Sequence, residues 1–227
     1  MQIGILGTGI VGQTIATALA AQGHTVMIGT RDPKATLGRD SGNAFNKTSF
    51  REWQAAHPAV RLGTFADAAR FGEVLINATS GDGALPALEA AGAEALGEKV
   101  MLDIANPLDF SRGMPPTLSV CNTDSLGERI QRAFPRLRVV KTLNTTNALV
   151  MINPAAVAGG DHSMFVAGDD ADAKAKVKTW LGDWFGWRDV IDLGDITMAR
   201  GTEMLLPIWI RLWGALGTPM FNFKVAR

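Results

Sequence analysis

The sequence contains no tyrosine and only one cysteine, Cys121. With a single cysteine, the chain has no intramolecular disulfide, no Cys-x-x-Cys redox pair and no cysteine-rich metal site. Without tyrosine, it cannot use the Tyr-x-x-x-Lys pair with which short-chain dehydrogenases protonate a carbonyl oxygen. Histidine is also scarce, and His24, His57 and His162 lie outside the segments where we predict a ligand crevice. We therefore expect neither a metal site nor a catalytic acid–base side chain.

Neither sign of charge is in excess, because 22 basic residues balance 22 acidic ones. Such a chain lacks the basic surface typical of nucleic-acid-binding proteins. The most apolar stretch, residues 204–216, is interrupted by Pro207 and Arg211 and is shorter than the ~20 residues of a membrane span. The first six residues predict a strand rather than a signal peptide. We expect a soluble, cytoplasmic protein that binds neither nucleic acid nor membrane.

Short apolar runs alternate with helical patterns over residues 1–146, which is typical of parallel strands joined by right-handed crossovers. Between residues 33 and 63 the pattern predicts irregular chain around a single helix. The fold class indicated is α/β, a doubly wound Rossmann sheet. The predicted strands are 3–6, 25–28, 74–78, 100–104 and 138–143, and the predicted helices lie near 15–20, 49–56, 85–96 and 125–134.

Residues 147–227 predict a small C-terminal α/β domain on the substrate side, after the Rossmann domain of residues 1–146. A loop through residue 160 precedes a strand at 163–167, a helix at 171–185, a strand at 190–193 and a final apolar helix. Five of the six tryptophans lie there, and we expect them to pack a small core or a dimer contact, with a planar substrate as the alternative. The apolar residues of the last helix favour a homodimer, although core or substrate could also cover them. These residues are Leu205, Leu206, Ile208, Trp209, Leu212 and Trp213.

The segment 7–12 reads GTGIVG, a G-x-G-x-x-G motif between a predicted strand and a predicted helix. In this context the first glycine allows a tight turn, the second lets the backbone approach a pyrophosphate, and the third lets the helix pack on the strand. The motif predicts a dinucleotide cofactor, with a purely structural glycine loop as the alternative. The residues of this predicted site are Gly7, Thr8, Gly9, Ile10, Val11 and Gly12.

The end of the second strand predicts NADP rather than NAD. Sites for NAD usually place Asp or Glu here, on the ribose 2′-hydroxyl, whereas this chain has Thr30 followed by Arg31. A hydroxyl beside a guanidinium suits a 2′-phosphate, because Arg31 can form charge-assisted hydrogen bonds to it. Lys34 and Arg39 could add positive charge. The alternatives are that Arg31 pairs with Asp32 in a surface turn, or that Asp32 binds the ribose of NAD.

Three further strand ends carry small, hydroxyl or amide side chains. Because the carboxyl ends of parallel strands face the ligand crevice, these residues could hydrogen-bond the nicotinamide carboxamide. Ordinary loop capping is the alternative for each segment. The candidate residues are Ala78, Thr79, Ser80, Asn106, Pro107 and Asn144.

Glu203 lies among apolar residues of the final helical segment, where a carboxylate needs a partner. We expect it to pair with Arg200 or Arg211 in a structural role.

Six segments follow one another along the chain: GTGIVG at 7–12, GTRDP at 29–33, DIANP at 103–107, VVKTLNT at 139–145, VAGDD at 166–170 and RGTEM at 200–204. With these segments in this order, the chain resembles the coenzyme F420-dependent NADP oxidoreductase family over nearly its whole length. The resemblance implies hydride exchange between NADP(H) and a deazaflavin, in a dimer of Rossmann domains with small C-terminal domains. The same domain is similar to the cytosolic part of six-transmembrane ferric reductases, which pass electrons from NADPH to flavin.

By position, the resemblance implies pyrophosphate contacts from residues 8–11, 2′-phosphate contacts from Thr30 and Arg31, and nicotinamide contacts from residues 78–80 and Asn106. Asn144, where archaeal members tend to have histidine, would lie beside the acceptor ring, so a flavin-type acceptor stays open beside F420. A ring acceptor takes hydride at one atom and its proton from solvent, so orientation is the main demand on the protein.

Two other functions stay open. A β-hydroxyacid dehydrogenase or imine reductase shares the N-terminal unit but normally adds a helical domain of about a hundred residues, for which the tail is too short. A non-catalytic NADP sensor would bind the cofactor without turnover. An open crevice beside the nicotinamide would favour an enzyme, and a crevice filled by the chain's own tryptophans would favour a sensor.

Overall fold

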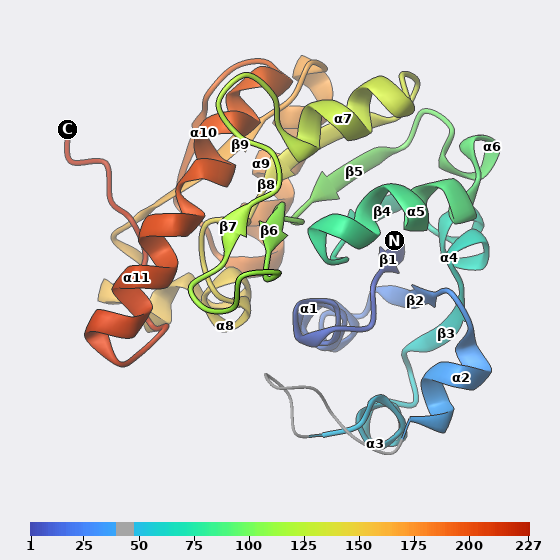
Figure 1. Ribbon diagram of the computed structural model, residues 1–227. Helices are drawn as coiled ribbons and strands as arrows, with labels where there is room; N and C mark the ends of the chain where they lie inside the picture. Colours follow the sequence, from blue (N-terminus) through green and yellow to red (C-terminus); the bar gives the residue numbers. More distant parts are fainter. Residues whose placement is uncertain (40–47) are drawn as a thin grey trace.

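The computed structural model describes residues 1–39 and 48–227, which form a central sheet with helices on both faces (Figure 1). Within these residues the sheet has eight strands, in the order β10-β9-β8-β5-β4-β1-β2-β3. Neighbouring strands are parallel except β8 and β9. The strands are β1 (Gln2–Leu6), β2 (Thr25–Thr30), β3 (Arg61–Thr64), β4 (Val74–Asn77), β5 (Val100–Asp103), β8 (Arg138–Thr142), β9 (Ser163–Ala167) and β10 (Asp189–Asp192).

This topology confirms the predicted Rossmann fold of the α/β class. Strand order reverses between β1 and β4, because the chain adds β2 and β3 on one side of β1 and later adds β4, β5 and β8 on the other. In open parallel sheets, ligands bind at such a switch point, outside the carboxyl ends of the strands. The fold therefore directs the search for a site to the loops that follow β1, β4, β5 and β8.

Strands β9 and β10 extend the same sheet beyond β8. Strand β9 is antiparallel to β8, and Lys141 pairs with Ala167 across them. The predicted boundary between residues 146 and 147 thus lies between two neighbouring strands of one sheet, and the division into two domains stays a prediction.

Alternating side chains of the strands build two apolar cores, one on each face. Ile3 and Ile5 of β1 point into one core, and Leu6 points into the other. This period of two is expected for a sheet covered on both faces. Helices α1 (Ile10–Ala21), α3 (Phe50–Ala56), α8 (Ala148–Ile152) and α9 (Ala171–Phe185) cover the first face, and α4 (Phe65–Phe71), α5 (Gly81–Ala91), α6 (Ala93–Leu96), α7 (Leu126–Ala133) and α10 (Ala199–Met204) cover the second.

The segment predicted to be irregular contains more structure than expected. A short helix, α2 (Pro33–Gly38), starts after Asp32, whose carboxylate accepts the Ala35 N–H at 2.9 Å. The edge strand β3 pairs with β2. Both were missed because a six-residue helix and a four-residue edge strand are too short to show a hydrophobic period. Residues 40–47 of this predicted irregular segment lie outside the described residues.

The C-terminal part also differs in detail from the prediction. Helix α8 lies within the segment predicted as a loop, and the final apolar helix is divided into α10 and α11 (Leu206–Leu216). Pro207 lies in the first turn of α11, where its missing N–H leaves no hydrogen bond unmade. In residues 1–39 and 48–227, no helix is both long and apolar enough to cross a membrane.

The Glu128–Arg200 pair joins α7 to α10 and should make stability depend on pH. The Nε of Arg200 donates to Glu128 at 2.8 Å, and the Ser125 hydroxyl donates to the same carboxylate at 2.8 Å. Arg200, opposed by burial and helped by Ser125, lowers the pKa of Glu128. A lowered folded-state pKa contributes stability above the unfolded-state pKa and loses it as pH falls through the folded-state value.

We therefore expect Glu128→Gln to lower the free energy of unfolding by about 1 kcal/mol at pH 7. The difference from the wild type should be smaller at about pH 3 than at pH 7, because this contribution is lost as pH falls from the ordinary Glu pKa of about 4.3 through the lowered folded-state pKa. Thermal unfolding at both pH values measures it, with Glu89→Gln on the exposed face of α5 as control. An equal difference at both pH values would contradict this role of the charge.

Candidate functional site

The glycine loop predicted to hold pyrophosphate connects β1 to α1. Gly7 adopts φ +118°, a conformation that favours glycine. A Cβ at Gly12 would lie 2.3 Å from the carbonyl oxygen of Gly7. A Cβ at Gly9 would meet only open space among the described atoms, and this N-cap residue lacks a side chain to bond the first N–H groups of α1. The open helix N-terminus can therefore hold an anion such as a pyrophosphate.

The other residues of this loop lie around the same helix start. Thr8 is half-buried and its carbonyl accepts a hydrogen bond from Gln13 at 2.8 Å, while Ile10 is exposed. Val11 lines the cavity described below.

The predicted 2′-phosphate site lies where β2 ends. Arg31 is exposed and, in the described part of the chain, forms no ion pair, so the alternative of an Arg31–Asp32 pair is not observed. The Asp32 carboxylate caps α2 instead. Thr30 is buried, and its hydroxyl lies 2.9 Å from that of Thr36, which also accepts from Arg39 at 3.0 Å. Arg31 and Lys34 are thus exposed cations that follow this strand end directly along the chain.

A cavity of about 500 Å³ opens at the carboxyl ends of β4 and β5. It lies between the start of α1, the start of α5 and the hairpin of β6 (Leu108–Asp109) and β7 (Thr117–Leu118) (Figure 1). Four predicted residues, Val11, Thr79, Ser80 and Asn106, line it together. Among the residues that the structure describes, no tryptophan lines it.

Asn106 and Asn144 join the loops after β5 and β8. The Asn106 amide donates to the Asn144 carbonyl at 2.9 Å, and the Asn144 amide donates to Asn106 Oδ1 at 3.0 Å. Asn144 is 2% exposed and lies behind Asn106 rather than in the cavity lining. Pro107 is also buried, and Ala78 donates its N–H to the Leu6 carbonyl at 2.8 Å. The predicted nicotinamide residues therefore divide into a cavity-lining group and a supporting group.

Glu203 pairs with neither Arg200 nor Arg211, so that expectation was wrong. Its carboxylate lies 2.8 Å from the Nζ of Lys141, in the interior. Arg200 is occupied by Glu128, and Arg211 donates to the Pro207 carbonyl. Arg200 and Glu203 both contact α7, but Arg200 bonds to Glu128 there, whereas Glu203 accepts the N–H group of Leu126 at the start of that helix.

Lys141 was not recognised from the sequence, although it is the largest fully buried side chain in the described chain. Its Nζ lies 2.9 Å from Asp103 and donates to the Ala105 carbonyl. Burial alone would lower the pKa of Lys141, but Asp103 and Glu203 outweigh it and raise the pKa, so the ammonium stays charged. The sequence does contain a signal for this buried pair, because the apolar run VMLD ends in Asp103 and the apolar run VVK ends in Lys141.

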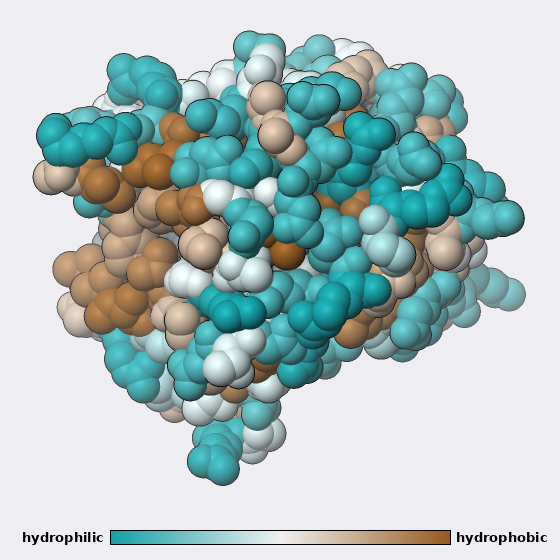
Figure 2. Space-filling view, turned by 90° about the horizontal axis from the view of Figure 1, so that it is seen from above, coloured by the Kyte–Doolittle hydropathy of each residue, from teal (hydrophilic) through white to brown (hydrophobic). Residues whose placement is uncertain are grey.

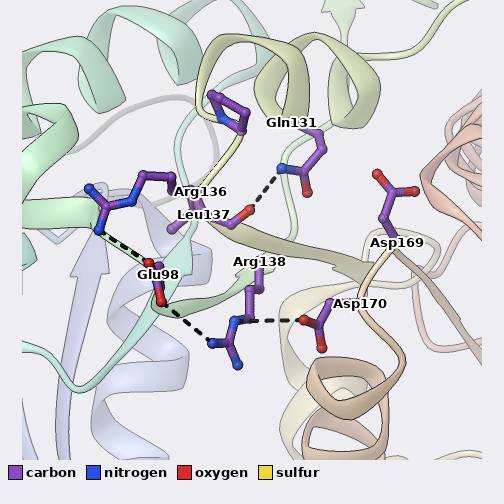
Figure 3. A pocket seen from close by; sticks show the side chains of 8 residues that line it. Glu98, Gln131, Arg136, Leu137, Arg138, Asp169 and Asp170 are labelled. Carbon is purple, nitrogen blue, oxygen red and sulfur yellow. Dashed lines mark hydrogen bonds and ion pairs between the residues drawn. The ribbon is translucent and has the colours of Figure 1, made fainter.

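A second pocket lies at the other end of the strands, at the amino ends of β5 and β8 (Figure 3). There Glu98 lies between Arg136 at 3.2 Å and Arg138 at 3.9 Å, and Arg138 also approaches Asp170 at 3.7 Å. Its cations are thus paired, and it is remote from the carboxyl ends of the strands. The crevice beside the glycine loop is the better candidate site.

A doubly wound sheet with a glycine loop and an open crevice at its switch point is typical of Rossmann proteins that bind a dinucleotide. The chain belongs to the family described as NADP oxidoreductase, coenzyme F420-dependent, whose model matches residues 2–107. A solved structure of a candidate F420-dependent NADP reductase from Arthrobacter sp. FB24 is 62% identical, covers 100% of both chains and superposes with a TM-score of 0.95.

More distant relatives are longer than this chain. Metalloreductase STEAP3 from Rattus norvegicus is 27% identical over 212 residues, which make up 92% of this chain but 38% of that protein. An imine reductase from Streptomyces aurantiacus is 17% identical with a TM-score of 0.60, covering 95% of this chain and 63% of that one. At this identity the likeness to the imine reductase concerns the fold alone.

Proposed function

We propose that the protein binds NADPH in the crevice and transfers hydride between its nicotinamide and a deazaflavin (F420) or flavin-type acceptor. The observation that carries this proposal is the open cavity at the carboxyl ends of β4 and β5, which continues from the glycine loop and has no tryptophan among its described lining residues. A sensor would need no such space for a second ring. The family membership supports NADP(H) as the cofactor.

The residues present fit a dinucleotide. The open N-terminus of α1 would hold the pyrophosphate, and exposed Arg31 would hold the 2′-phosphate. Thr79, Ser80 and Asn106 would hydrogen-bond the nicotinamide half. NADPH supplies the hydride when bound, and the protein orients the two rings and excludes water between them. Because a ring acceptor exchanges its proton with solvent, no acid–base side chain is assigned.

The test is oxidation of NADPH by the purified protein, followed at 340 nm, with F420, FMN, FAD, a ferric chelate and a cyclic imine offered separately. Turnover with F420 or a flavin supports the proposal. Turnover with the imine alone would favour an imine reductase, and tight NADPH binding without turnover would favour a sensor.

In this proposal residues 147–227 provide the acceptor side and a homodimer contact, and the protein is cytoplasmic. Figure 2 shows hydrophobic surface gathered on the side formed by α10, α11 and the C-terminal tail. Met204, Ile208 and Leu216 are 38%, 48% and 57% exposed there. Contiguous apolar surface of this kind usually marks an interface.

We expect light scattering after size exclusion to give the mass of a dimer for the wild type. Ile208→Glu should shift the mass to that of a monomer, because it buries a carboxylate in the contact. Lys178→Glu on the polar face of α9 is the control. A wild-type monomer at all concentrations would contradict the proposed contact.

A further inference from the structure

A chain of buried polar groups runs beneath the crevice and connects its loops to the C-terminal helices. It consists of Asn77 on β4, Asp103 on β5, Lys141 on β8 and Glu203 on α10, all at most 1% exposed. Strand register sets the first three side by side, since Asn77 pairs with Asp103 and Asp103 with Lys141. The proposed function assigns no task to this chain of groups.

The network holds the peptide that leads to Asn106. Asp103 accepts the Ala105 N–H at 3.3 Å, and Lys141 donates to the Ala105 carbonyl. Ala105 and Asn106 both line the cavity, and Asn106 pairs with Asn144. The orientation of the Asn106 amide therefore depends on the peptide that the Lys141 ammonium fixes.

The same network reaches a second wall of the crevice. Asn77 donates to Asp103 at 2.8 Å, and its amide oxygen accepts the Thr79 hydroxyl at 2.7 Å. Thr79 lines the cavity together with Asn106. Two cavity walls are thus held by one buried hydrogen-bonded chain.

At its other end the network is anchored by a helix N-terminus. Glu203 accepts the N–H groups of Leu126 at 2.8 Å and Gly127 at 3.0 Å, at the start of α7. These N–H groups and the Lys141 ammonium together compensate the buried carboxylate. Glu203 therefore ties the position of Lys141 to the packing of α7 on α10.

We infer that Lys141 is a positioning residue for the nicotinamide half of the cofactor, acting through the Ala105 carbonyl and the Asn106 amide. The inference rests on the proposed NADPH site. It predicts that Lys141 affects the nicotinamide half and not the adenosine half, whose contacts lie at Arg31, beyond the glycine loop. A residue that only stabilises the fold would affect both halves alike.

The experiment measures the dissociation constants of NADPH and of 2′,5′-ADP, which carries only the adenosine half with its 2′-phosphate. Lys141→Met alone leaves two buried carboxylates without their cation and is expected to fold poorly. The double variant Lys141→Met with Glu203→Gln keeps the same net buried charge, because Asp103 then remains alone with its bonds from Asn77 and Ala105.

We expect the double variant to bind 2′,5′-ADP like the wild type and NADPH about tenfold more weakly. Lys174→Met is the matched control, since Lys174 is also nearly buried, lies 2.9 Å from Asp192 and donates to a carbonyl, but far from the crevice. It should change neither constant.

An unchanged ratio of the two constants in the double variant would overturn the inference, whether both affinities are kept or both fall together. Failure of both Lys141 variants to fold would overturn it as well, because the network would then serve the sheet alone. Failure of the proposed NADPH site is distinguishable, since the wild type itself would then not bind NADPH more tightly than 2′,5′-ADP.

Discussion

Replacing Arg31 with alanine should weaken NADPH binding by about 10- to 100-fold and leave NADH binding nearly unchanged. Arg31 is exposed at the end of β2, and in the described residues no carboxylate pairs with it. An exposed guanidinium that no carboxylate holds can form charge-assisted hydrogen bonds to a 2′-phosphate, which NADH lacks. Titration of the tryptophan fluorescence with each cofactor measures the two affinities.

The control for this experiment is Arg136→Ala. Arg136 is also an exposed arginine, but it pairs with Glu98 at the other end of the strands (Figure 3). It should leave both affinities unchanged, which excludes a general effect of lowering the positive charge. Equal losses for NADPH and NADH in Arg31→Ala would indicate adenine stacking instead, and no loss for NADPH would refute the 2′-phosphate site.

The sequence predicts the central fold well because its signals are local. Strand β4 is the apolar run VLIN, followed at once by small and polar turn residues, and β9 and α9 begin and end where their patterns predict. Edge strand β3 has the sequence RLGT. Its one large apolar residue, Leu62, cannot by itself show the alternation that predicts a strand. The place of β3 in the sheet comes from pairing with β2, which no local pattern records.

The candidate site likewise has one part that local sequence predicts and one part that it does not. The glycine loop could be predicted because its geometry depends on six consecutive residues. The Lys141 network could not, because Asp103 and Lys141 are 38 residues apart and meet only through the register of β5 and β8. Glu203 of α10 contacts Lys141 as well, although Arg200 and Arg211 are closer to it along the chain.

The glycine loop yields the second prediction, that Gly12→Ala destabilises the protein by about 3 kcal/mol. The added Cβ would lie 2.3 Å from the Gly7 carbonyl oxygen, and neither backbone can move without shifting α1 against β1. The Gly7 backbone has little room to move away, because it packs so closely on the next loop that even a Cβ at Gly7 would lie 2.5 Å from the Ala78 carbonyl oxygen. Thermal unfolding should show a decrease in Tm of about 10 °C.

Gly9→Ala is the matched variant, because it adds the same methyl group three residues earlier, at the N-cap of α1. Gly9 has φ −74° and ψ 178°, which alanine adopts freely, and its Cβ would meet open space among the described residues. Its Tm should therefore fall by less than about 2 °C, whereas NADPH should no longer raise the Tm, because the methyl group occupies the space proposed for the pyrophosphate. If Gly9→Ala keeps the full thermal shift with NADPH, the pyrophosphate does not lie on this turn. If Gly12→Ala keeps the wild-type Tm, the contact between α1 and β1 is looser than the distance implies, and the steric reason for glycine at this position fails.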